Sequence, residues 1–579
     1  MRKTLERILM LSAVLLGVSS AACHAERVQI DIIETSDVHG CFFPYDFITR
    51  QDKPGSLARV SSYVRRLRNT GAHVILLDNG DILQGQPVCY YSNYIDTLHT
   101  NIAASVCNYL QYDAQTIGNH DVETGHACYD KWRQEVTYDQ LCANVIDTRT
   151  GAPYYKPYKI IERGGVRVAV LGMITPAIPC WLSENLWSGL RFDDMVTTAR
   201  QWIPYIRLHE RPDVVVGLFH SGRDGGIQTD SICEDVSTRV AQEVEGFDLI
   251  LFGHDHTRHS GSVKGPDGRQ VVMLDPANNA LSVAHATISL SRCNGRWCID
   301  SIDGRLADVA HEPIDTAYLR HFQPYIDEVK AFTDRPIGTL ARDLRSCDAF
   351  FGNSAFGDLI LNLQLRLTQA DIALSAPLQF NSVLKKGPIR VADMFNLYRY
   401  ENQLCVMRLT GEEIRRHLEM SYDLWVNTMH TPTDHLLLLS SSTRGDQQRL
   451  GFQNLTFNFD SAAGIDYTVD VTKPVGQKVT ILRMSNGQPF DEKRWYRVAL
   501  NSYRANGGGE LLTRGAGIPA DSLLSRITWR SDKDLRFYLM QEIERMGNID
   551  PQPNHNWRFV PEAWTKPAAE RDRKLLFGF

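Results

Sequence analysis

The sequence predicts two domains of different fold class, a layered α/β domain followed by an α+β domain. With 579 residues the chain is too long to fold around one hydrophobic core. In the first half, short apolar runs alternate with segments whose apolar residues recur at helical spacing, which is the pattern of layered α/β folds. The second half mixes helical and strand patterns without this alternation.

Seven short apolar runs in the first half predict the strands of the layered domain. They cover residues 28–34, 74–77, 114–117, 166–173, 214–219, 249–252 and 271–274. Two helices are predicted between the first three of these runs. One contains Leu57, Val60, Val64 and Leu67, and another covers residues 95–110.

Residues 313–335 predict a single helix that ends near Pro336-Ile337-Gly338 and connects two differently patterned halves. We therefore divide the chain into residues 26–312, a linker over 313–336, and residues 337–579. In the last part, helices are predicted over 354–367 and 532–546, and a capping box of Thr410 and Glu413 opens another. Strands are predicted over 452–459, 467–471 and 496–500.

The first 25 residues resemble a secretory signal. A basic start is followed by an apolar run over 8–18 that is too short to span a bilayer, and then by small residues. Cleavage after Ala25 would release the mature chain, and a lipid-anchored Cys23 is the alternative. We expect an exported periplasmic or cell-envelope protein whose mature part has no transmembrane span.

Charge and cysteine content narrow the class of site. A net charge of −6 disfavours binding to a nucleic-acid polymer, since such binding relies on neutralising phosphates. A small phosphorylated substrate needs only local positive charge, which metal ions can supply. The cysteines form no CxxC pair, which disfavours a zinc–thiolate site. Cys293 and Cys298 flank the turn signal Asn294-Gly295 and could form a bridge across a hairpin.

Polar side chains follow five of the predicted strands, usually beside a glycine. The five segments are Asp37-Val38-His39-Gly40, Asn79-Gly80-Asp81, Gly118-Asn119-His120-Asp121, His220-Ser221-Gly222 and Gly253-His254-Asp255-His256. Each segment alone is compatible with an ordinary loop. Ligands of open α/β sheets bind outside the carboxyl ends of the strands, so we expect these side chains to converge in one crevice.

The residue types in these loops predict a pair of metal ions. Seven candidate ligands are too many for one ion and suit two: Asp37, His39, Asp81, Asn119, His220, His254 and His256. Carboxylate, imidazole and amide ligands suit Mn²⁺, Zn²⁺, Co²⁺ or Fe²⁺. Two such ions clamp the attacking and leaving oxygens of an in-line displacement, and this arrangement favours phosphoryl transfer.

At these five segments the sequence resembles the calcineurin-like metallophosphoesterase superfamily, whose pattern is D-x-H, G-D, G-N-H-[DE], H and G-H-x-H, over about residues 28–300. The resemblance implies a metallophosphoesterase sandwich with two metals. Asp37, His39, Asp81 and His256 would hold one ion. Asp81 would bridge to a second ion held by Asn119, His220 and His254. His120 would stabilise charge at the scissile phosphate, and Glu123 would orient His120 from a position where relatives often carry Asp.

The second half resembles the 5′-nucleotidase C-terminal domain over about 337–530, in particular that of bifunctional 2′,3′-cyclic-nucleotide 2′-phosphodiesterase/3′-nucleotidases. The resemblance rests on residues 375–377, 398–402, 464–471 and 501–509. It implies that two aromatic rings, Tyr400 and Tyr503, enclose the base of a nucleotide. Stacking on aromatic faces tolerates different bases.

Two departures from 5′-nucleotidases disfavour a plain 5′-nucleotidase. Residues 375–380 read Ser-Ala-Pro-Leu-Gln-Phe in place of an Asn-Gly-Gly-Gly-Ile-Arg block, and Gly509 replaces an acidic residue. The resemblance therefore implies hydrolysis of 2′,3′-cyclic nucleotides and 3′-nucleotides for extracytoplasmic salvage. A 5′-nucleotidase or UDP-sugar hydrolase and a non-catalytic nucleotide-binding protein remain the alternatives.

Overall fold

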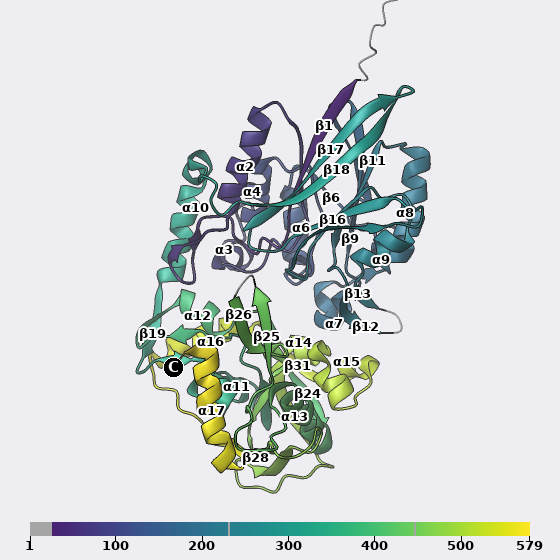
Figure 1. Ribbon diagram of the computed structural model, residues 1–579. Helices are drawn as coiled ribbons and strands as arrows, with labels where there is room; N and C mark the ends of the chain where they lie inside the picture. The colour runs from purple at the N-terminus through teal and green to yellow at the C-terminus, as the bar shows by residue number, and fades with distance from the viewer. Residues whose placement is uncertain (1–25, 230–231, 445–446, 579) are drawn as a thin grey trace, which may run out of the picture.

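The computed structural model describes residues 26–229, 232–444 and 447–578, which form two stacked domains (Figure 1). The predicted signal over residues 1–25, including Cys23, lies outside the described residues. Within the described ranges, no helix has the length and apolarity needed to cross a membrane.

The N-terminal domain is built around two six-stranded sheets. The first has the order β18 (Arg296–Asp308), β17 (Ser282–Cys293), β1 (Arg27–Thr35), β4 (His73–Asp78), β5 (Ala114–Gln115) and β6 (Asp139–Gln140). The second has the order β15 (Arg258–Lys264), β16 (Gln270–Pro276), β14 (Leu249–Phe252), β11 (Val214–His220), β9 (Val166–Ile174) and β8 (Tyr158–Arg163). All seven predicted strands are present.

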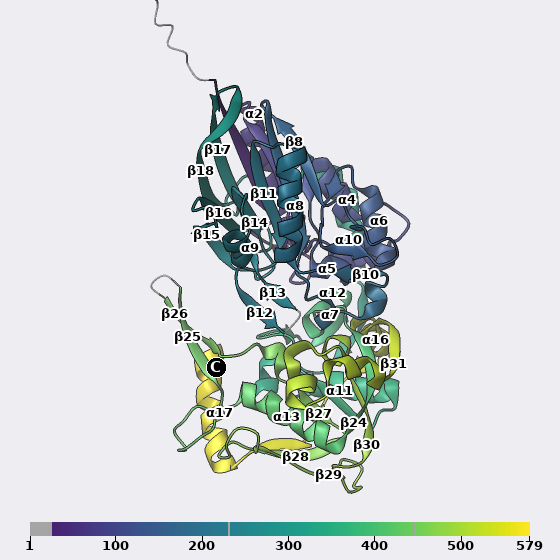
Figure 2. The same cartoon turned by 90° about the vertical axis from the view of Figure 1, so that its right-hand side faces the viewer.

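The two sheets pack face to face and helices cover their outer faces. Ile32 and Leu77 of the first sheet share one buried cluster with Val216 and Leu251 of the second. The outer face of the first sheet packs against α2 (Leu57–Asn69), α4 (Ile102–Leu110), α6 (His126–Glu135) and α10 (Thr316–Asp334). The outer face of the second packs against α8 (Met195–His209) and α9 (Ser237–Glu243). This layering is the predicted α/β sandwich (Figure 2).

The expected helix over 95–110 is wrong at its start. The π-helix η1 (Tyr91–Ile95) ends where that helix was expected to begin, and α4 starts only at Ile102. The Asn101 side chain accepts a hydrogen bond from the Ala103 N–H at 2.9 Å and so caps α4. Leu98 is 93% exposed, so the apolar residues of 95–101 do not continue the buried face of the helix.

The turn at Asn294-Gly295 joins β17 to β18 as predicted. In the ladder Cys293 lies opposite Arg296, and Cys298 lies opposite Ser291. The side chain of Cys293 lies outside the described part of the chain, so the bridge between the two cysteines stays a prediction.

The predicted connecting helix is present as α10. Asp315 caps it by accepting hydrogen bonds from the N–H groups of Ala317 and Tyr318. Tyr318, Phe322 and Ile326 belong to the buried cluster of the N-terminal domain. The helix ends at Asp334, close to the predicted exit, and Pro336-Ile337-Gly338 begins β19 (Pro336–Leu340), which pairs with β23 (Gly387–Arg390).

The C-terminal domain has a five-stranded sheet with helices on both faces. Its order is β27 (Ser461–Ala463), β21 (Ile372–Ser375), β30 (Trp495–Asn501), β24 (Gln403–Thr410) and β31 (Ile527–Asp534). One face packs on α11 (Ala355–Thr368), α12 (Val391–Leu397) and α16 (Leu535–Met546), and the other packs on α13 (Gly411–Trp425). A second sheet contains β28 (Ile465–Asp470), between β29 (Val479–Met484) and β33 (Trp557–Val560). This is the predicted α+β class.

Two predicted elements of this domain need correction. The capping box of Thr410 and Glu413 does open α13, but residues 452–459 do not form a strand. β26 (Gln447–Phe452) ends there, and a 3₁₀ turn covers Thr456–Asn458. The Phe457 carbonyl accepts a hydrogen bond from Arg504 at 2.9 Å instead of joining a sheet. The helix expected over 532–546 begins at Leu535, because Asp534 ends β31 and caps α16.

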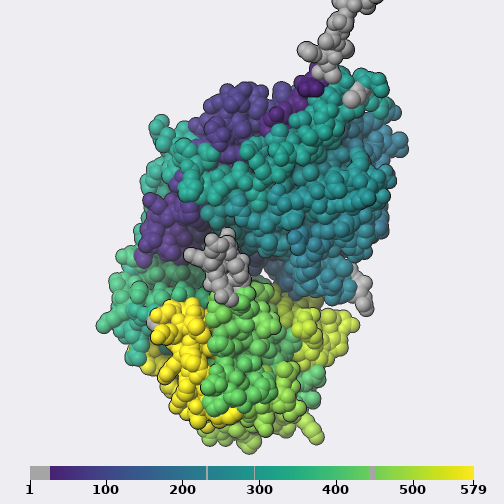
Figure 3. Space-filling model, viewed as in Figure 1, coloured from purple at the N-terminus to yellow at the C-terminus, as the bar shows by residue number. Residues whose placement is uncertain are grey.

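The domains contact each other through side chains of the N-terminal domain that enter the C-terminal one. Tyr90 of α3 (Pro87–Tyr90) belongs to the buried cluster of α12 and α16, and its ring lies 5.6 Å from that of Phe395. Its hydroxyl donates a hydrogen bond to Asp534 at 3.3 Å. The two domains form the upper and lower parts of one elongated body (Figure 3).

Candidate metal centre

The loops after β1, β4, β5, β11 and β14 converge and bring the predicted ligands into two groups. Strands β1, β4 and β5 run parallel in the first sheet and β11 and β14 run parallel in the second, so their carboxyl ends meet at one edge. The first group contains Asp37, His39 and His256, and the second contains Asp81, His220 and His254. In each group, one potential ligand atom per residue lies within 4.8 Å of the others.

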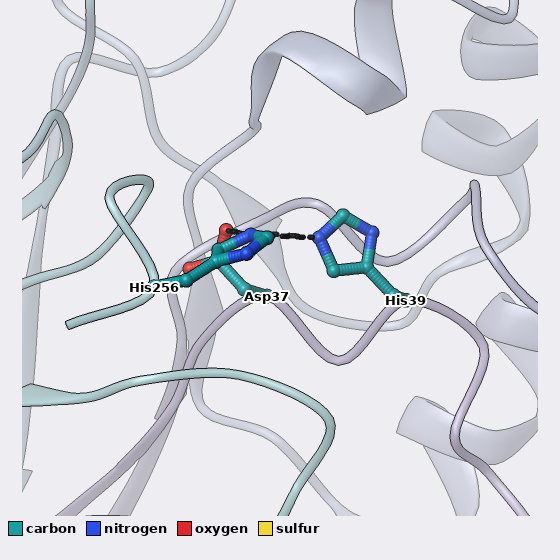
Figure 4. A group of neighbouring side chains, drawn as sticks. All are labelled: Asp37, His39 and His256. Atoms are coloured by element: carbon teal, nitrogen blue, oxygen red, sulfur yellow. Dashed lines mark hydrogen bonds and ion pairs between the residues drawn. The ribbon is translucent and has the colours of Figure 1, made fainter. Parts of the chain in front are cut away.

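The first group points two ring nitrogens and a carboxylate oxygen at one place (Figure 4). The Nε2 atoms of His39 and His256 are 3.1 Å apart. Asp37 Oδ1 lies 3.3 Å from Nε2 of His256 and 3.9 Å from that of His39. This oxygen is buried and has no hydrogen-bond partner in the described chain. A cation bound here would satisfy both nitrogens and the oxygen, so the residues fit a metal.

The second group surrounds a buried imidazole. Nε2 of His220 lies 3.3 Å from Asp81 Oδ2 and 3.0 Å from Asn119 Oδ1. His220 and Asp81 are almost completely buried. The candidate ligand Asn119 therefore joins this group, and all seven predicted ligands lie in the two groups.

Hydrogen bonds fix the orientation of two of the histidines. His39 donates its Nδ1–H to the Gln84 carbonyl at 3.0 Å, and His220 donates its Nδ1–H to the Asn79 carbonyl at 2.7 Å. Each bond holds a proton on Nδ1 and directs Nε2 into the site, as in metal-binding histidines generally.

The backbone of the ligand loops is constrained. Five of the seven candidate ligands have left-handed φ angles: Asp37 (50°), His39 (49°), Asp81 (55°), His254 (85°) and His256 (58°). Non-glycine residues rarely adopt such angles, and those that do cluster at functional sites. A Cβ on Gly118 would lie 2.1 Å from Asp81 Oδ1, and one on Gly253 would lie 2.6 Å from Asp37 Oδ2. The motif glycines thus allow the loops to approach the ligands closely.

His120 lies beside the first group without belonging to it. Its ring centre is 5.4 Å from that of His39, and its backbone N–H donates to Asp81 Oδ1 at 2.7 Å. Nδ1–H donates to Glu123 Oε2 at 2.6 Å, so the predicted orienting residue contacts it directly. Burial disfavours the charged ring, but the negative charges of Asp81 and Glu123 outweigh burial and raise the pKa of His120 to about 9.

The pKa shifts in the two groups indicate that positive charge is favoured at this site. Burial lowers the pKa of His39 to about 3, so its ring is neutral near pH 7. For His220 burial acts in the same direction, but the Asp81 charge dominates and raises the pKa to about 10. The neighbouring histidines hold the Asp37 and Asp81 carboxyls below their ordinary pKa despite burial. A divalent cation would supply the charge that a proton on His220 supplies here.

Sequence reasoning missed two acidic residues that organise the site. Asp121 accepts hydrogen bonds from the N–H groups of Asp81, Ile82, Leu83 and Gly118, and so ties two ligand loops together. Glu234, on β13 (Cys233–Asp235), lies 3.0 Å from Nε2 of His254. Asp121 stands within a quoted motif, whereas nothing in the sequence around Glu234 marks it.

The two predicted base-binding tyrosines are half-buried residues of the C-terminal domain. The guanidinium of Arg399 lies 5.8 Å from the Tyr400 ring centre. The Tyr503 ring lies against Gly508, where a Cβ would come within 2.5 Å of it, and 6.0 Å from Phe457. Burial chiefly raises the pKa of Tyr503 to about 12, with added effects of Tyr400 and of Glu234 in the other domain. Burial also raises the pKa of Tyr400, and the charge of Glu123 in the N-terminal domain adds to this effect. The described chain contains no ring contact between the two tyrosines.

Fold and site define a metal-dependent phosphoester hydrolase. The family model of the calcineurin-like phosphoesterases matches residues 30–258, and that of the 5′-nucleotidase C-terminal domain matches residues 331–514. The chain therefore contains a domain similar to the calcineurin-like phosphoesterases, followed by a domain similar to the C-terminal domain of 5′-nucleotidases. The first of these families implies divalent metal ions, in agreement with the two groups of candidate ligands.

Curated relatives cover most of the chain. It is 24% identical to the 2′,3′-cyclic-nucleotide 2′-phosphodiesterase/3′-nucleotidase of Yersinia enterocolitica over 95% of this chain and 91% of that protein. Identity to the Salmonella typhimurium enzyme of the same name is 26%, over 94% and 90%. The trifunctional nucleotide phosphoesterase YfkN of Bacillus subtilis is 26% identical over 93% of this chain, which spans only 39% of that protein.

Solved structures share the fold. A putative 5′-nucleotidase from Staphylococcus aureus superimposes with a TM-score of 0.74 at 22% identity, over 92% of this chain and 99% of that one. The 5′-nucleotidase precursor from Thermus thermophilus gives a TM-score of 0.64 at 21% identity, over 92% and 100%.

Proposed function

We propose that this enzyme hydrolyses 2′,3′-cyclic nucleotides and 3′-nucleotides at a pair of divalent cations, Mn²⁺, Zn²⁺, Co²⁺ or Fe²⁺. The observation that carries the proposal is the pair of adjacent groups of candidate ligands with His120 beside them. The near full-length relatives named for this activity, together with the departures at residues 375–380 and Gly509, support the choice of substrate.

The ligands divide between the two ions as follows. Asp37, His39 and His256 would hold the first ion, and Asn119, His220 and His254 would hold the second. Asp81 would be shared between the two ions. Its Oδ2 lies 3.3 Å from His220, and its charge also acts on the buried ring of His39. The fixed orientations of His39 and His220 support this division, because both direct Nε2 into the site.

Bound cations would polarise the phosphoryl oxygens and make a water molecule acidic enough to act as a nucleophile near neutral pH. The chain's own residues perform the remaining tasks. His120, held by Glu123, presents its other ring nitrogen to the charge that develops on the phosphoryl and leaving oxygens. Tyr400 and Tyr503 enclose the base and so orient the ribose phosphate relative to the site.

The remaining organisation of the chain is part of the proposal. Residues 1–25 export the protein to the periplasm or cell envelope, as a soluble enzyme or through a lipid on Cys23. Residues 26–312 form the catalytic domain, 313–336 the linker and 337–579 the substrate-binding domain. The basic start, short apolar run and small residues of the first 25 positions support the location.

A comparison of three substrates tests the proposal. Purified enzyme with Mn²⁺ is assayed on 5′-AMP, 3′-AMP and 2′,3′-cyclic AMP, and kcat/KM is expected to be highest for the last two. Preference for 5′-AMP would instead favour the second candidate, a 5′-nucleotidase or UDP-sugar hydrolase, which the fold shared with 5′-nucleotidases keeps open. Nucleotide binding in equilibrium dialysis without turnover would indicate a binding protein.

A further inference from the structure

His254 differs from the other two oriented histidines in how its ring is held. His39 and His220 each donate Nδ1–H to a backbone carbonyl and direct Nε2 into the site. In His254 it is Nε2 that has the partner, and this partner is the carboxylate of Glu234 at 3.0 Å. A ring nitrogen of His254 also lies within 4.8 Å of ligand atoms of Asp81 and His220.

We propose that Glu234 is a positioning residue, which accepts the Nε2–H of His254 and thereby directs the Nδ1 lone pair toward Asp81 and His220. A neutral imidazole carries one N–H, so a donor at Nε2 leaves Nδ1 as the nitrogen available to a cation. This inference rests on the proposed division of ligands, in which His254 serves the second ion.

The Glu234 side chain is itself held firmly enough for this task. Its second oxygen, Oε2, accepts the Ile227 N–H at 2.5 Å, and its backbone carbonyl accepts hydrogen bonds from Thr175 and Ser221. The side chain is 14% exposed. Gly226 has φ +65° and leaves room for the carboxylate, since a Cβ there would lie 2.5 Å from Oε2.

The His254 ring is confined on its other sides as well. It lies 5.6 Å from the Trp181 ring and 5.2 Å from the His220 ring. Its backbone N–H donates to Asp37 Oδ2 at 3.0 Å, which joins the two ligand groups. Rotation of the imidazole would break the Glu234 contact, so that contact selects one of the two ring orientations.

A different interpretation is that Glu234, Asp235 and His254 bind a cation themselves, because their potential ligand atoms also lie within 4.8 Å of one another. The contacts disfavour it. Asp235 Oδ1 accepts the Gly222 N–H at 2.8 Å and lies 3.9 Å from Nε2 of His254. Both Glu234 oxygens already accept hydrogen bonds.

The test is a titration of metal-free full-length protein with Co²⁺, in which calorimetry and visible absorption monitor binding. Wild type is expected to bind two Co²⁺. Glu234→Ala should weaken one of the two binding events about 10- to 100-fold, the usual effect of losing a partner of a metal-binding histidine, and leave the other unchanged. Glu234→Gln keeps an acceptor oxygen and should lose less, which also covers the case that the alanine variant folds poorly.

Two control variants separate positioning from general damage. Asp235→Asn keeps the acceptor for Gly222 and should bind both ions as wild type does. Glu243→Gln, an exposed carboxylate on α9 paired with Arg200 and Arg239, should do the same. The absorption of the affected Co²⁺ should change in Glu234→Gln without a change in melting temperature.

The outcomes distinguish failure of the proposed function from failure of the role of Glu234. If wild type bound fewer than two Co²⁺, the proposed function would fail together with this inference. Two ions bound with unchanged affinities in Glu234→Ala would overturn the role of Glu234 alone. A third Co²⁺ that Asp235→Asn removes would show that the acidic pair is itself a cation site, which also overturns it.

Discussion

The two domains hold their functional side chains by different means. In the N-terminal domain the backbone places the ligands, with left-handed φ angles at Asp37 and Asp81 and close glycine contacts at Gly118 and Gly253. In the C-terminal domain, buried ion pairs between side chains hold the loops that carry the tyrosines. A site that the backbone places can be recognised in a short stretch of sequence. A site held by ion pairs depends on residues that are far apart in the chain.

Arg536 and Arg504 illustrate the second kind. Arg536 is fully buried, pairs with Glu401 at 2.8 Å, and donates to the carbonyls of Tyr398 and Arg399, which fixes the loop of Tyr400. Arg504 pairs with Asp460 through two nitrogens. The partners are separated by 135 and 44 residues, and removing one partner would leave a buried charge uncompensated.

The largest expected effect follows from removal of Asp81, the proposed bridging carboxylate. Asp81→Ala should nearly abolish turnover and lower the metal content while the fold remains, because loop positions are set by the backbone and by Asp121. Asp81→Asn is a matched variant that retains an acceptor for the His120 N–H but loses the charge. Metal analysis and kcat measure the outcome. Two bound ions and a rate within about threefold of wild type would contradict the two-metal proposal.

His120→Asn separates chemistry from metal binding. The variant should keep both ions and lower kcat on the order of 10²- to 10³-fold, as expected for a group that stabilises charge at the reacting phosphate. Glu123→Gln should cost less, because it only misorients the His120 ring. The control is His126→Asn, a histidine on α6 whose partner is Asp130, which should leave kcat unchanged. Loss of a metal in His120→Asn would show that the residue is a ligand.

The tyrosines test the role of the C-terminal domain. Tyr400→Ala and Tyr503→Ala should each lower kcat/KM on nucleotides roughly five- to 150-fold. This corresponds to a loss of about 1–3 kcal/mol of transition-state stabilisation. Hydrolysis of bis-p-nitrophenyl phosphate, which has no base, should change little. The double variant should lose about as much as either single one, since half of the pair holds a base poorly.

A control variant and one contrary outcome limit the interpretation of the tyrosine variants. Tyr538→Ala on α16, where the hydroxyl pairs with Asp532, serves as a control and should change neither activity. Equal losses on base-free and nucleotide substrates would mean that Tyr400 and Tyr503 support the fold or the domain boundary. The metal site of the N-terminal domain would stand in either case.

The same difference explains what the sequence could predict. Strand ends and glycines lie next to the candidate ligands in the chain, so the convergence of Asp37, Asp81 and His256 could be predicted by pattern alone. Glu234 reaches His254 from a hairpin 20 residues earlier without any motif. Residues 452–459 alternate like a strand, but Arg504 captures the Phe457 carbonyl and Phe459 stacks on Trp425. Such long-range contacts override local propensity and cannot be recognised in a single sequence.

The smallest expected effect concerns the release of protons when a cation binds to a preformed site. If the backbone has already placed the ligands, cation binding should displace protons rather than rearrange loops. In the metal-free protein the pKa of His220 is about 10, so its ring is charged at pH 7 and must lose a proton to become a ligand. The pKa of His39 is about 3, so this ring is already neutral and releases none.

Affinity for the ion at His220 should therefore rise about tenfold per pH unit between pH 7 and 9, the linkage for release of one proton. The sign follows from the raised pKa, because protons compete with the cation below about pH 10 and cease to compete above it. Calorimetric titration with Co²⁺ in buffers of different ionisation enthalpy counts the protons released, and far-ultraviolet circular dichroism monitors the backbone. Binding that is independent of pH but changes the dichroism would mean that the cation organises the loops, and the contrast between the two domains would disappear.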